Sequence, residues 1–165
     1  MLVAMTDTLT VAERSRLMSK IRGKNTGPER AVRSLLHRAG YRFRIHVRGL
    51  PGTPDVVLPK YRTVVFVHGC FWHRHRGCKI ATMPHSHVRF WKEKFRRNVA
   101  NDARHRRKLR RLGWQVVVVW SCQLKQPERI LAKIEKALQP RRAAYVLAPP
   151  RRWPLAAESR PAYGK

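Results

Sequence analysis

The sequence predicts an α/β domain in which a mixed β-sheet carries helices on both of its faces. Two short apolar runs, 55–59 and 63–67, flank the turn residues 60–62 and indicate an antiparallel hairpin. A third run, WQVVVVW at 114–120, follows a long basic helical segment. A strand that is reached through a helix lies parallel to its neighbour, and such a continuous apolar run is typical of a strand covered on both faces.

Two helices are predicted ahead of the strands. The segment 10–22 begins with the spacing of a capping box and is expected to end at Gly23. Residues 25–40 form the second helix, which Pro28 opens and Gly40 closes.

The remaining elements follow from periodicity and composition. Residues 41–47 alternate between apolar and basic side chains, which predicts a half-exposed strand ahead of the hairpin. A long helix is expected within 87–113 and a last helix at about 127–138. The length suits one core, so we expect a single domain at 1–138 and a loosely held, Pro- and Arg-rich tail at 139–165.

The composition indicates a polyanionic partner. The chain carries 37 Lys and Arg against 9 Asp and Glu, a formal net charge of +28, while 43% of its residues are hydrophobic. A chain of this kind can build a core, so the charge favours double-stranded nucleic acid as the partner of a folded protein. No run approaches the length of a membrane span, and the start lacks the features of a signal peptide. We therefore expect a cytoplasmic protein with no membrane partner.

All three cysteines fit one metal site. Cys70, His75 and Cys78 have the spacing C-x4-H-x2-C, and Cys122 is the remaining cysteine. Cys70 and Cys122 follow two strands that are predicted to be parallel neighbours, so both should emerge at one edge of the sheet. Four nitrogen and sulfur ligands are typical of a structural zinc site, which would stabilise a loop poor in apolar residues. The alternative is three free thiols beside a solvated histidine.

Asp55 stands at the start of a buried strand, where an unpaired carboxylate is costly. A symmetric hairpin would set it opposite Val67, and the Val67 carbonyl would then join the carboxylate as a hard oxygen ligand for Mg²⁺. The alternative is that Asp55 caps the preceding turn, a common role for aspartate. The residues alone leave both interpretations open.

His73 is not needed to complete four ligands around zinc, so its imidazole is a candidate general base. It is also an alternative to His75 as the zinc ligand. Asp102 shares a helix face with Asn98 and either orients His73 or forms a surface ion pair with an arginine. Glu29 lies in the first turn of its helix, where it complements the helix dipole.

Five segments occur in a consistent order along the chain. They read RSRLMSKIRGKNTGPE, LPGTPDVVLP, VFVHGCFWHRH with a cysteine three residues on, FWKEKFRRNVANDAR and LGWQVVVVWSC. Together they resemble the very short patch repair (Vsr) DNA mismatch endonucleases over about residues 10–138, most specifically in HGCFWH. The resemblance implies a restriction-endonuclease-like fold with a zinc-stabilised loop. It also implies a Mg²⁺-dependent enzyme that nicks double-stranded DNA on one strand, 5′ to the thymine of a T:G mismatch.

The resemblance implies roles for individual residues. Asp55 would bind the catalytic Mg²⁺ together with the backbone carbonyl of Val67, and His73 would be the general base with Asp102 as its partner. The further active-site residues would be Glu29 and His68. The structural zinc ligands would be Cys70, His75, Cys78 and Cys122. Gly77 is an extra residue relative to the family pattern of this loop.

The same resemblance accounts for the large aromatic residues beside the cysteines. Phe71, Trp72 and Trp91 would wedge between base pairs from the major groove, while Met18 and Ile21 would press from the minor groove. Unstacking costs less where base pairing is already imperfect, so such wedges favour a mismatch. Without the resemblance, the first two would be expected to pack beneath the zinc loop and Trp91 along an apolar stripe of its helix.

Two other functions remain open from the residues. A non-catalytic zinc-containing nucleic-acid-binding protein explains the charge and the cysteines, but not Asp55 or a free His73. A restriction endonuclease of the same fold would cut both strands, usually as a dimer, whereas nicking of nucleoid DNA needs only the monomer that we expect. The sequence does not specify the base context, the choice of Met1 or Met5 as the start, or which mismatch-repair proteins cooperate.

Overall fold

A computed structural model of the chain describes residues 13, 16 and 23–139. Its elements are α2 (Gly27–Arg38), β1 (Val56–Leu58), the 3-10 helix η1 (Pro59–Tyr61), β2 (Thr63–His68), α3 (Val88–Arg111), β3 (Gln115–Trp120), the 3-10 helix η2 (Ser121–Lys125) and α4 (Pro127–Leu138). The predicted DNA-contacting helix at 10–22 lies outside the described residues except for positions 13 and 16. Met18, Ile21 and the predicted tail from residue 140 onward therefore also lie outside them.

The described helices form where their sequence signals predict them. Thr26 is the N-cap of α2, and its side-chain oxygen accepts a hydrogen bond from the Glu29 N–H. Pro127 opens α4, since its missing N–H has no partner to lose in the first turn. Helices α3 and α4 lie within the predicted ranges 87–113 and 127–138.

The sheet has three strands in the order β1-β2-β3 and is mixed, as predicted. Strand β1 pairs antiparallel with β2, and β2 pairs parallel with β3. The carboxyl ends of β2 and β3 therefore lie at the same edge of the sheet, and the segments that follow them meet there.

The predicted register of the hairpin is wrong by one residue. Val56 pairs with Val65, so Asp55 continues opposite Phe66 rather than Val67. The reason lies in the turn, because η1 starts one residue before the predicted turn and ends β1 early. A shift of one residue changes which backbone groups meet across a hairpin.

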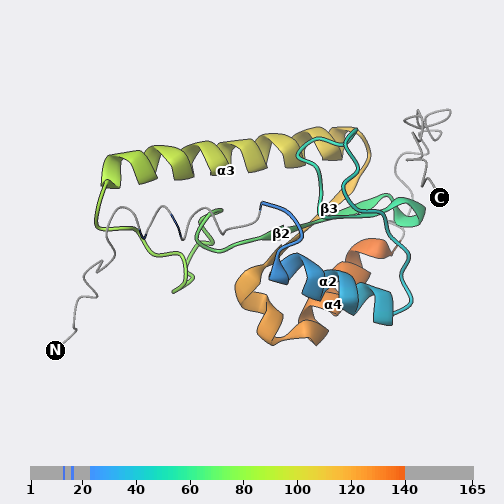
Figure 1. Cartoon of the computed structure of the whole chain (residues 1–165). Helices are drawn as coiled ribbons and strands as arrows, with labels where there is room; N and C mark the ends of the chain where they lie inside the picture. Colours follow the sequence, from blue (N-terminus) through green and yellow to red (C-terminus); the bar gives the residue numbers. More distant parts are fainter. Residues whose placement is uncertain (1–12, 14–15, 17–22, 140–165) are drawn as a thin grey trace, which may run out of the picture.

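Helices cover both faces of the sheet: α3 lies along one face, and α2 and α4 lie against the other (Figure 1). Alternate strand residues point to opposite faces, so the core has two parts. The part beneath α2 and α4 buries Val32, Leu36, Val56, Leu58, Val65, Val117, Val119, Ile130 and Ile134. The part beneath α3 buries Leu50, Val57, Val64, Phe66 and Leu109, with Val116 and Val118 packed against them. The predicted cover on both faces of the run 114–120 is confirmed.

The predicted strand at 41–47 is wrong except at one residue. Arg44 exchanges two backbone hydrogen bonds of 2.8 Å with Val57 and forms an isolated bridge on the edge of β1. Tyr41 and Phe43 still pack against the core, as their alternation indicates. Pairing does not continue because His46 adopts a left-handed conformation with φ 55°, which turns the chain away from the edge.

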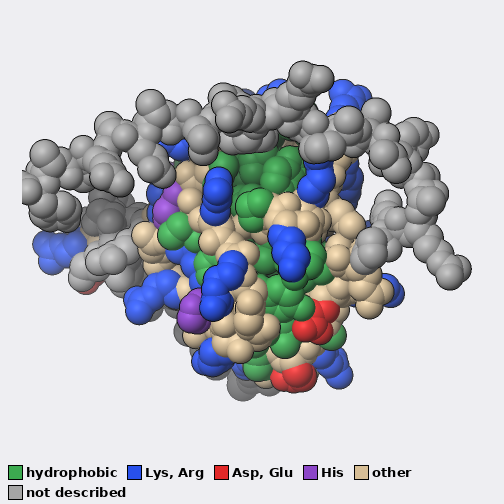
Figure 2. Space-filling model, turned by 90° about the vertical axis from the view of Figure 1, so that its right-hand side faces the viewer, with side chains coloured by type: hydrophobic (Ala, Val, Ile, Leu, Met, Phe, Trp, Pro, Cys, Tyr) green, Lys and Arg blue, Asp and Glu red, His purple; other side chains and the backbone are tan. Residues whose placement is uncertain are grey.

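In the described part of the chain, helices lack the combination of length and apolar character that crossing a bilayer requires. On the face shown in Figure 2, Lys and Arg side chains are spread over the surface, whereas Asp and Glu side chains gather mainly in one small area at the lower right. This face therefore presents mostly positive charge to a partner.

Candidate active site and metal cluster

The cysteines that follow the two parallel strands lie at the same edge of the sheet. His68, the last residue of β2, pairs with Trp120, the last residue of β3. Cys70 and Cys122 each follow two residues later, so both reach the same edge of the sheet. The loop after β2 then turns back, and His75 donates its backbone N–H to the Cys70 carbonyl at 3.0 Å.

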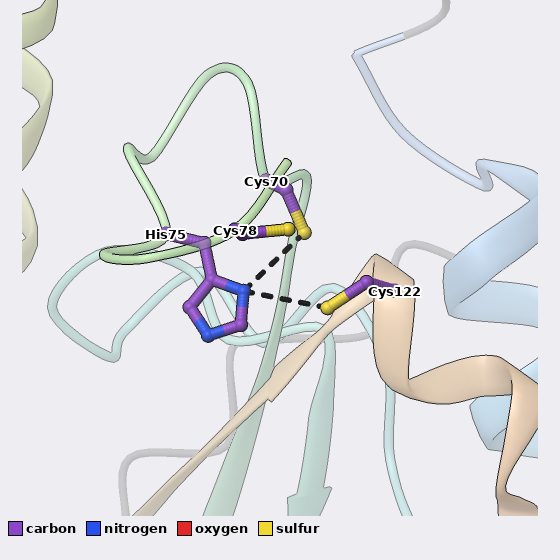
Figure 3. A group of neighbouring side chains, drawn as sticks. All are labelled: Cys70, His75, Cys78 and Cys122. Atoms are coloured by element: carbon purple, nitrogen blue, oxygen red, sulfur yellow. Dashed lines mark hydrogen bonds between the residues drawn. The ribbon is translucent and has the colours of Figure 1, made fainter. Parts of the chain in front are cut away.

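Figure 3 shows the side chains of Cys70, His75, Cys78 and Cys122 pointing toward a common centre. Their ligand atoms all lie within 4.8 Å of one another. His75 Nδ1 is 3.6 Å from Cys70 Sγ and 3.3 Å from Cys122 Sγ. Around a tetrahedral zinc ion, nitrogen and sulfur ligand atoms are separated by about 3.6 Å. The residues present therefore fit a closed four-ligand metal site.

The neighbouring thiols of the cluster influence the titration of one another. Although burial alone raises it, hydrogen bonds from Ser121 and the neighbouring cysteines lower the pKa of Cys70 below its usual value. Burial, followed by hydrogen bonding to Cys70 and Cys78, raises the pKa of Cys122 to about 12. Further thiolates are costly to form beside the first unless a positive ion lies between them.

Residues next to the cluster hold its ligands in place. The Ser121 hydroxyl donates to Cys70 Sγ at 3.3 Å, and the Cys70 N–H donates to the same hydroxyl oxygen at 3.3 Å. The His75 ring stacks on Trp120, with the ring centroids 4.3 Å apart and the planes 8° apart. The last residue of β3 therefore orients an imidazole of the cluster, and the first residue of η2 orients a thiol.

A pocket of about 600 Å³ opens beside this cluster, over the carboxyl end of β2. Five of the predicted active-site residues line it: Glu29, Asp55, His68, His73 and Asp102. They come from α2, from the residue just before β1, from the end of β2 with its following loop, and from α3. The structure thus brings together the residues that the family resemblance places in one active site.

Gly52 allows the loop before Asp55 to approach α3 closely. Its φ of +77° favours glycine, and a Cβ atom there would lie 2.8 Å from Nδ1 of His105. Any larger residue would push the loop away from α3. The glycine of the LPGTP segment therefore sets the distance between Asp55 and the residues that α3 contributes to the pocket.

Asp55 contacts the residue that the sequence predicts. The Val67 N–H donates to Asp55 Oδ2 at 2.7 Å. The pKa of Asp55 is raised from 3.8 to about 6: burial is the largest cause, the Val67 hydrogen bond acts to lower the pKa, and the Glu29 carboxylate acts to raise it. A carboxylate desolvated in this way favours a cation-binding role over the capping of a turn.

Glu29 has more contacts than a helix-dipole role requires. It is 5% exposed, and its carboxylate accepts hydrogen bonds from the Asn25 N–H, the Thr26 hydroxyl and the Arg33 guanidinium at 2.9, 2.8 and 3.0 Å. Arg33 also donates from Nε to the backbone carbonyl of Asp55 at 3.3 Å. This network ties the start of α2 to the backbone that carries Asp55.

His73 lies against Asp102 rather than in the metal cluster. Its Nδ1 atom is 2.7 Å from Asp102 Oδ2. One turn earlier on α3, Asn98 donates from Nδ2 to the Trp72 carbonyl at 3.0 Å and holds the loop beside the helix. The Asp102 carboxylate is thus directed toward a histidine and not toward a surface arginine.

His68 packs directly on this pair. Its ring stacks on His73 with centroids 3.9 Å apart and planes 13° apart, and its Nδ1 atom is 3.9 Å from Asp102 Oδ2. Burial, and then the neighbouring His73, lower the pKa of His68 to about 4, so this ring is neutral at neutral pH. The three side chains lie close enough to share a metal ion, but two imidazoles are a poor donor set for Mg²⁺.

The predicted wedge residues form one aromatic cluster with helix α3. Phe71 makes edge-to-face contacts with Trp72, Trp91 and Phe95, with ring centroids 5.1, 5.4 and 5.1 Å apart. Phe95 is buried, whereas the other three rings are partly exposed. Phe90 is 53% exposed and extends the cluster by contacting Trp91. Trp91 lies beside Phe95 on α3, as its alternative prediction states. The cluster as a whole packs against α3 and also presents aromatic surface to solvent.

Sequence reasoning missed three basic residues of the pocket. Lys24, His105 and Arg106 line it together with the predicted carboxylates and histidines. Arg106 had a detectable signal, since it is four residues after Asp102 and so shares its helix face. In a chain with 37 Lys and Arg, that spacing alone does not single it out.

Comparison with known proteins places the chain in a family. The family model described as DNA mismatch endonuclease Vsr matches residues 6–79. The type II nicking enzyme V.XorIIP of Xanthomonas oryzae pv. oryzae is 50% identical over 136 residues, which cover 82% of this chain and 99% of that protein. The DNA mismatch endonuclease Vsr of Escherichia coli is 41% identical over 126 residues, 76% of this chain and 80% of that protein. The chain belongs to the Vsr family.

Membership of the Vsr family makes this protein a DNA endonuclease. The type II nicking enzyme V.NmeAIP of Neisseria meningitidis is a further relative, 45% identical over 121 residues that cover 73% of this chain and 86% of that protein. The similarity to the Xanthomonas relative covers 82% of the chain, so it extends well beyond the region 6–79 of the family model. It therefore reaches α3, which carries Asp102.

Proposed function

We propose that this Vsr-family protein nicks one strand of double-stranded DNA, 5′ to the thymine of a T:G mismatch, and so starts very short patch repair. The observation that carries the proposal is the pocket in which Asp55 lies beside the hydrogen-bonded pair of His73 and Asp102. A partly exposed aromatic cluster adjoins this pocket through Trp72, which belongs to both. A hydrolytic centre next to a base-stacking surface suits an enzyme that cuts beside a disturbed base pair.

His73 is the general base of the proposed reaction. Because its Nδ1 atom is engaged by Asp102 at 2.7 Å, its Nε2 atom is the nitrogen that takes a proton from the attacking water. Asp102 holds the ring and stabilises the positive charge that the ring gains. The neutral His68 ring stacks on one face of the His73 ring and helps to hold that ring in position.

Asp55 and the Val67 carbonyl would hold a catalytic Mg²⁺, with Glu29 as a nearby carboxylate. The desolvated carboxylate and a backbone oxygen are hard ligands, which Mg²⁺ prefers. When bound, the ion supplies positive charge that stabilises the scissile phosphate and the leaving oxygen. The network through Arg33 keeps the Asp55 backbone in place, so the chain itself contributes a preformed carboxylate site.

We assign zinc to the cluster of Cys70, His75, Cys78 and Cys122, because three thiolates and one imidazole are typical ligands of structural zinc. The ion would hold the loop after β2, from which His73 and the aromatic residues project. Phe71, Trp72 and Trp91 would wedge into DNA at the mismatch. On the family resemblance we also propose a restriction-endonuclease-like fold and a cytoplasmic monomer, since cutting one strand needs one active site.

The proposed activity is tested with labelled duplexes that differ at one base pair. Incubation with Mg²⁺ should nick the T:G duplex only in the strand that contains the thymine, on the 5′ side of that base. The matched duplex should be cut far more slowly, since its base pairs resist unstacking. Cutting of both strands at matched sites would instead assign a restriction endonuclease, and binding without any cutting would assign a non-catalytic DNA-binding protein.

Asp102→Asn should slow nicking about 10- to 100-fold, because the loss of a supporting hydrogen-bond partner disturbs the orientation and charge of His73. Single-turnover nicking of the T:G duplex measures this effect, and affinity for the duplex should stay unchanged. Asn101→Ala is the matched control, since it alters an exposed residue next in the chain on the same helix. Normal nicking by Asp102→Asn would contradict the role assigned to Asp102.

A further inference from the structure

Arg106 stands at the junction of two pockets. It is half-buried on α3 and lines the active-site pocket together with Asp55, His73 and Asp102. It also lines a second pocket of about 380 Å³, which shares His68, His73 and Asp102 with the first. Its Nε atom donates to the backbone carbonyl of Asp102 at 3.2 Å, so the side chain is held beside the catalytic pair.

The charge of Arg106 has no carboxylate partner within the described residues. The nearest carboxylate in its own helix turn is that of Asp102, which contacts His73 at 2.7 Å, while Arg106 bonds the Asp102 backbone instead. Arg33, which lies near the same pocket, is different, because Glu29 pairs with it at 3.0 Å. A guanidinium that is half-buried without a carboxylate is available to an anionic ligand.

Other arginines beside the second pocket are less available to the active site. The Arg74 guanidinium packs over the Phe95 ring at 4.7 Å and donates to the Thr82 carbonyl at 2.8 Å. Arg76 is exposed and lines only the second of the two pockets. Among the arginines that the structure describes, Arg106 is therefore the one that lines the pocket containing Asp55 and His73.

We propose that Arg106 is a further catalytic residue, which contacts the non-bridging oxygens of the scissile phosphate. This inference rests on the proposed nicking activity. In that reaction the water oxygen bonds to phosphorus as its proton passes to His73, and the bond from phosphorus to the leaving oxygen breaks. Negative charge on the phosphate and the leaving oxygen is redistributed during this step, and a fixed guanidinium fork stabilises it.

The test compares Arg106→Gln with Arg107→Gln. Both substitutions remove one positive charge from adjacent positions, but Arg107 is exposed and lines neither pocket. Single-turnover nicking of the T:G duplex should fall about 10²- to 10³-fold for Arg106→Gln, the usual loss for one transition-state donor, and should stay near the parent rate for Arg107→Gln. Affinity for the duplex should weaken to a similar, small extent in both, because each loses one phosphate-attracting charge.

Zinc content and melting temperature separate this role from a structural one and should match the parent for both variants. Arg106→Lys provides a second test that keeps the charge and the aliphatic stem; it should retain stability and nick about 10-fold more slowly, since one ammonium cannot replace a planar fork. Equal nicking rates for Arg106→Gln and Arg107→Gln, or parent-like nicking by Arg106→Lys, would overturn this inference alone. A parent protein that nicks no duplex would overturn the proposed function and this inference with it.

Discussion

Asp55→Asn should abolish nicking and, in the absence of Mg²⁺, make the protein more stable. Asparagine keeps the shape of the side chain and can still accept the Val67 hydrogen bond, which is 2.7 Å long. It removes the negative charge that the proposed Mg²⁺ site requires, so the nicking rate should fall by about three orders of magnitude or more. Nicking of the T:G duplex at saturating Mg²⁺ measures the loss.

The gain in stability follows from the titration of Asp55. Burial raises its pKa from 3.8 to about 6 in the folded protein. An acid with a raised pKa costs stability as the pH rises from 3.8 through about 6, and the cost is complete above that value. A shift of this size corresponds to at most about 3 kcal/mol. In buffer without Mg²⁺ at pH 7.5, which leaves the proposed zinc site loaded, Asp55→Asn should therefore melt several degrees above the parent.

Glu93→Gln is the matched control, because it neutralises an exposed carboxylate that forms ion pairs with Arg96 and Arg97 of its own helix. It should nick like the parent, and its melting temperature should change little. The stability difference between Asp55→Asn and the parent should shrink as the pH falls below about 6 toward 3.8. Equal melting temperatures at pH 7.5, or substantial nicking by Asp55→Asn, would contradict the assignment of Asp55 as a desolvated metal ligand.

His75→Ala should unfold the loop, while His73→Ala should leave the loop folded and stop the chemistry. His75 Nδ1 lies within 3.6 Å of two cysteine sulfurs, so its loss opens the proposed zinc site. Binding of structural zinc can contribute on the order of 10 kcal/mol of folding free energy. We expect His75→Ala to lose zinc, DNA affinity and much of its thermal stability together, as measured by elemental analysis, duplex binding and thermal melting.

His73→Ala should keep one zinc ion and normal affinity for the T:G duplex, because its ring contacts Asp102 and His68 and not the thiols. Its nicking rate should fall about 10²- to 10⁴-fold, the usual loss for a general base. His85→Ala, which alters an exposed histidine of the same loop region, should leave all three properties unchanged. Exchange of the two phenotypes would reverse the roles of His73 and His75.

Much of the fold could be predicted because its signals are local. Thr26 and Pro28 mark the start of α2, and Gly113 follows the end of α3. The strand 41–47 shows where local signals fail. Its alternation correctly predicted that Tyr41 and Phe43 face the core. Strand pairing, however, depends on a neighbouring backbone, and the positive φ of His46 turns the chain away from the edge of β1.

The candidate site also combines features that the sequence predicted with features that it did not. The spacing of its cysteines and histidine was sufficient to predict a four-ligand cluster, because two parallel strands must end at one edge. The hairpin register was not predictable to one residue, since the 3-10 helix η1 shortened β1.

By itself, the sequence determined which residue types occur at which spacing, and these specified helices α2, α3 and α4, the mixed sheet, the cysteine cluster and the resemblance to the Vsr family. Only the tertiary structure decided which histidine of HRH faces the thiols, which faces Asp102, and that Arg106 joins the same pocket. The physical reason is distance along the chain. The left-handed Arg74, with φ 54°, separates the two rings, and their partners lie 29 and 47 residues away, on α3 and after β3.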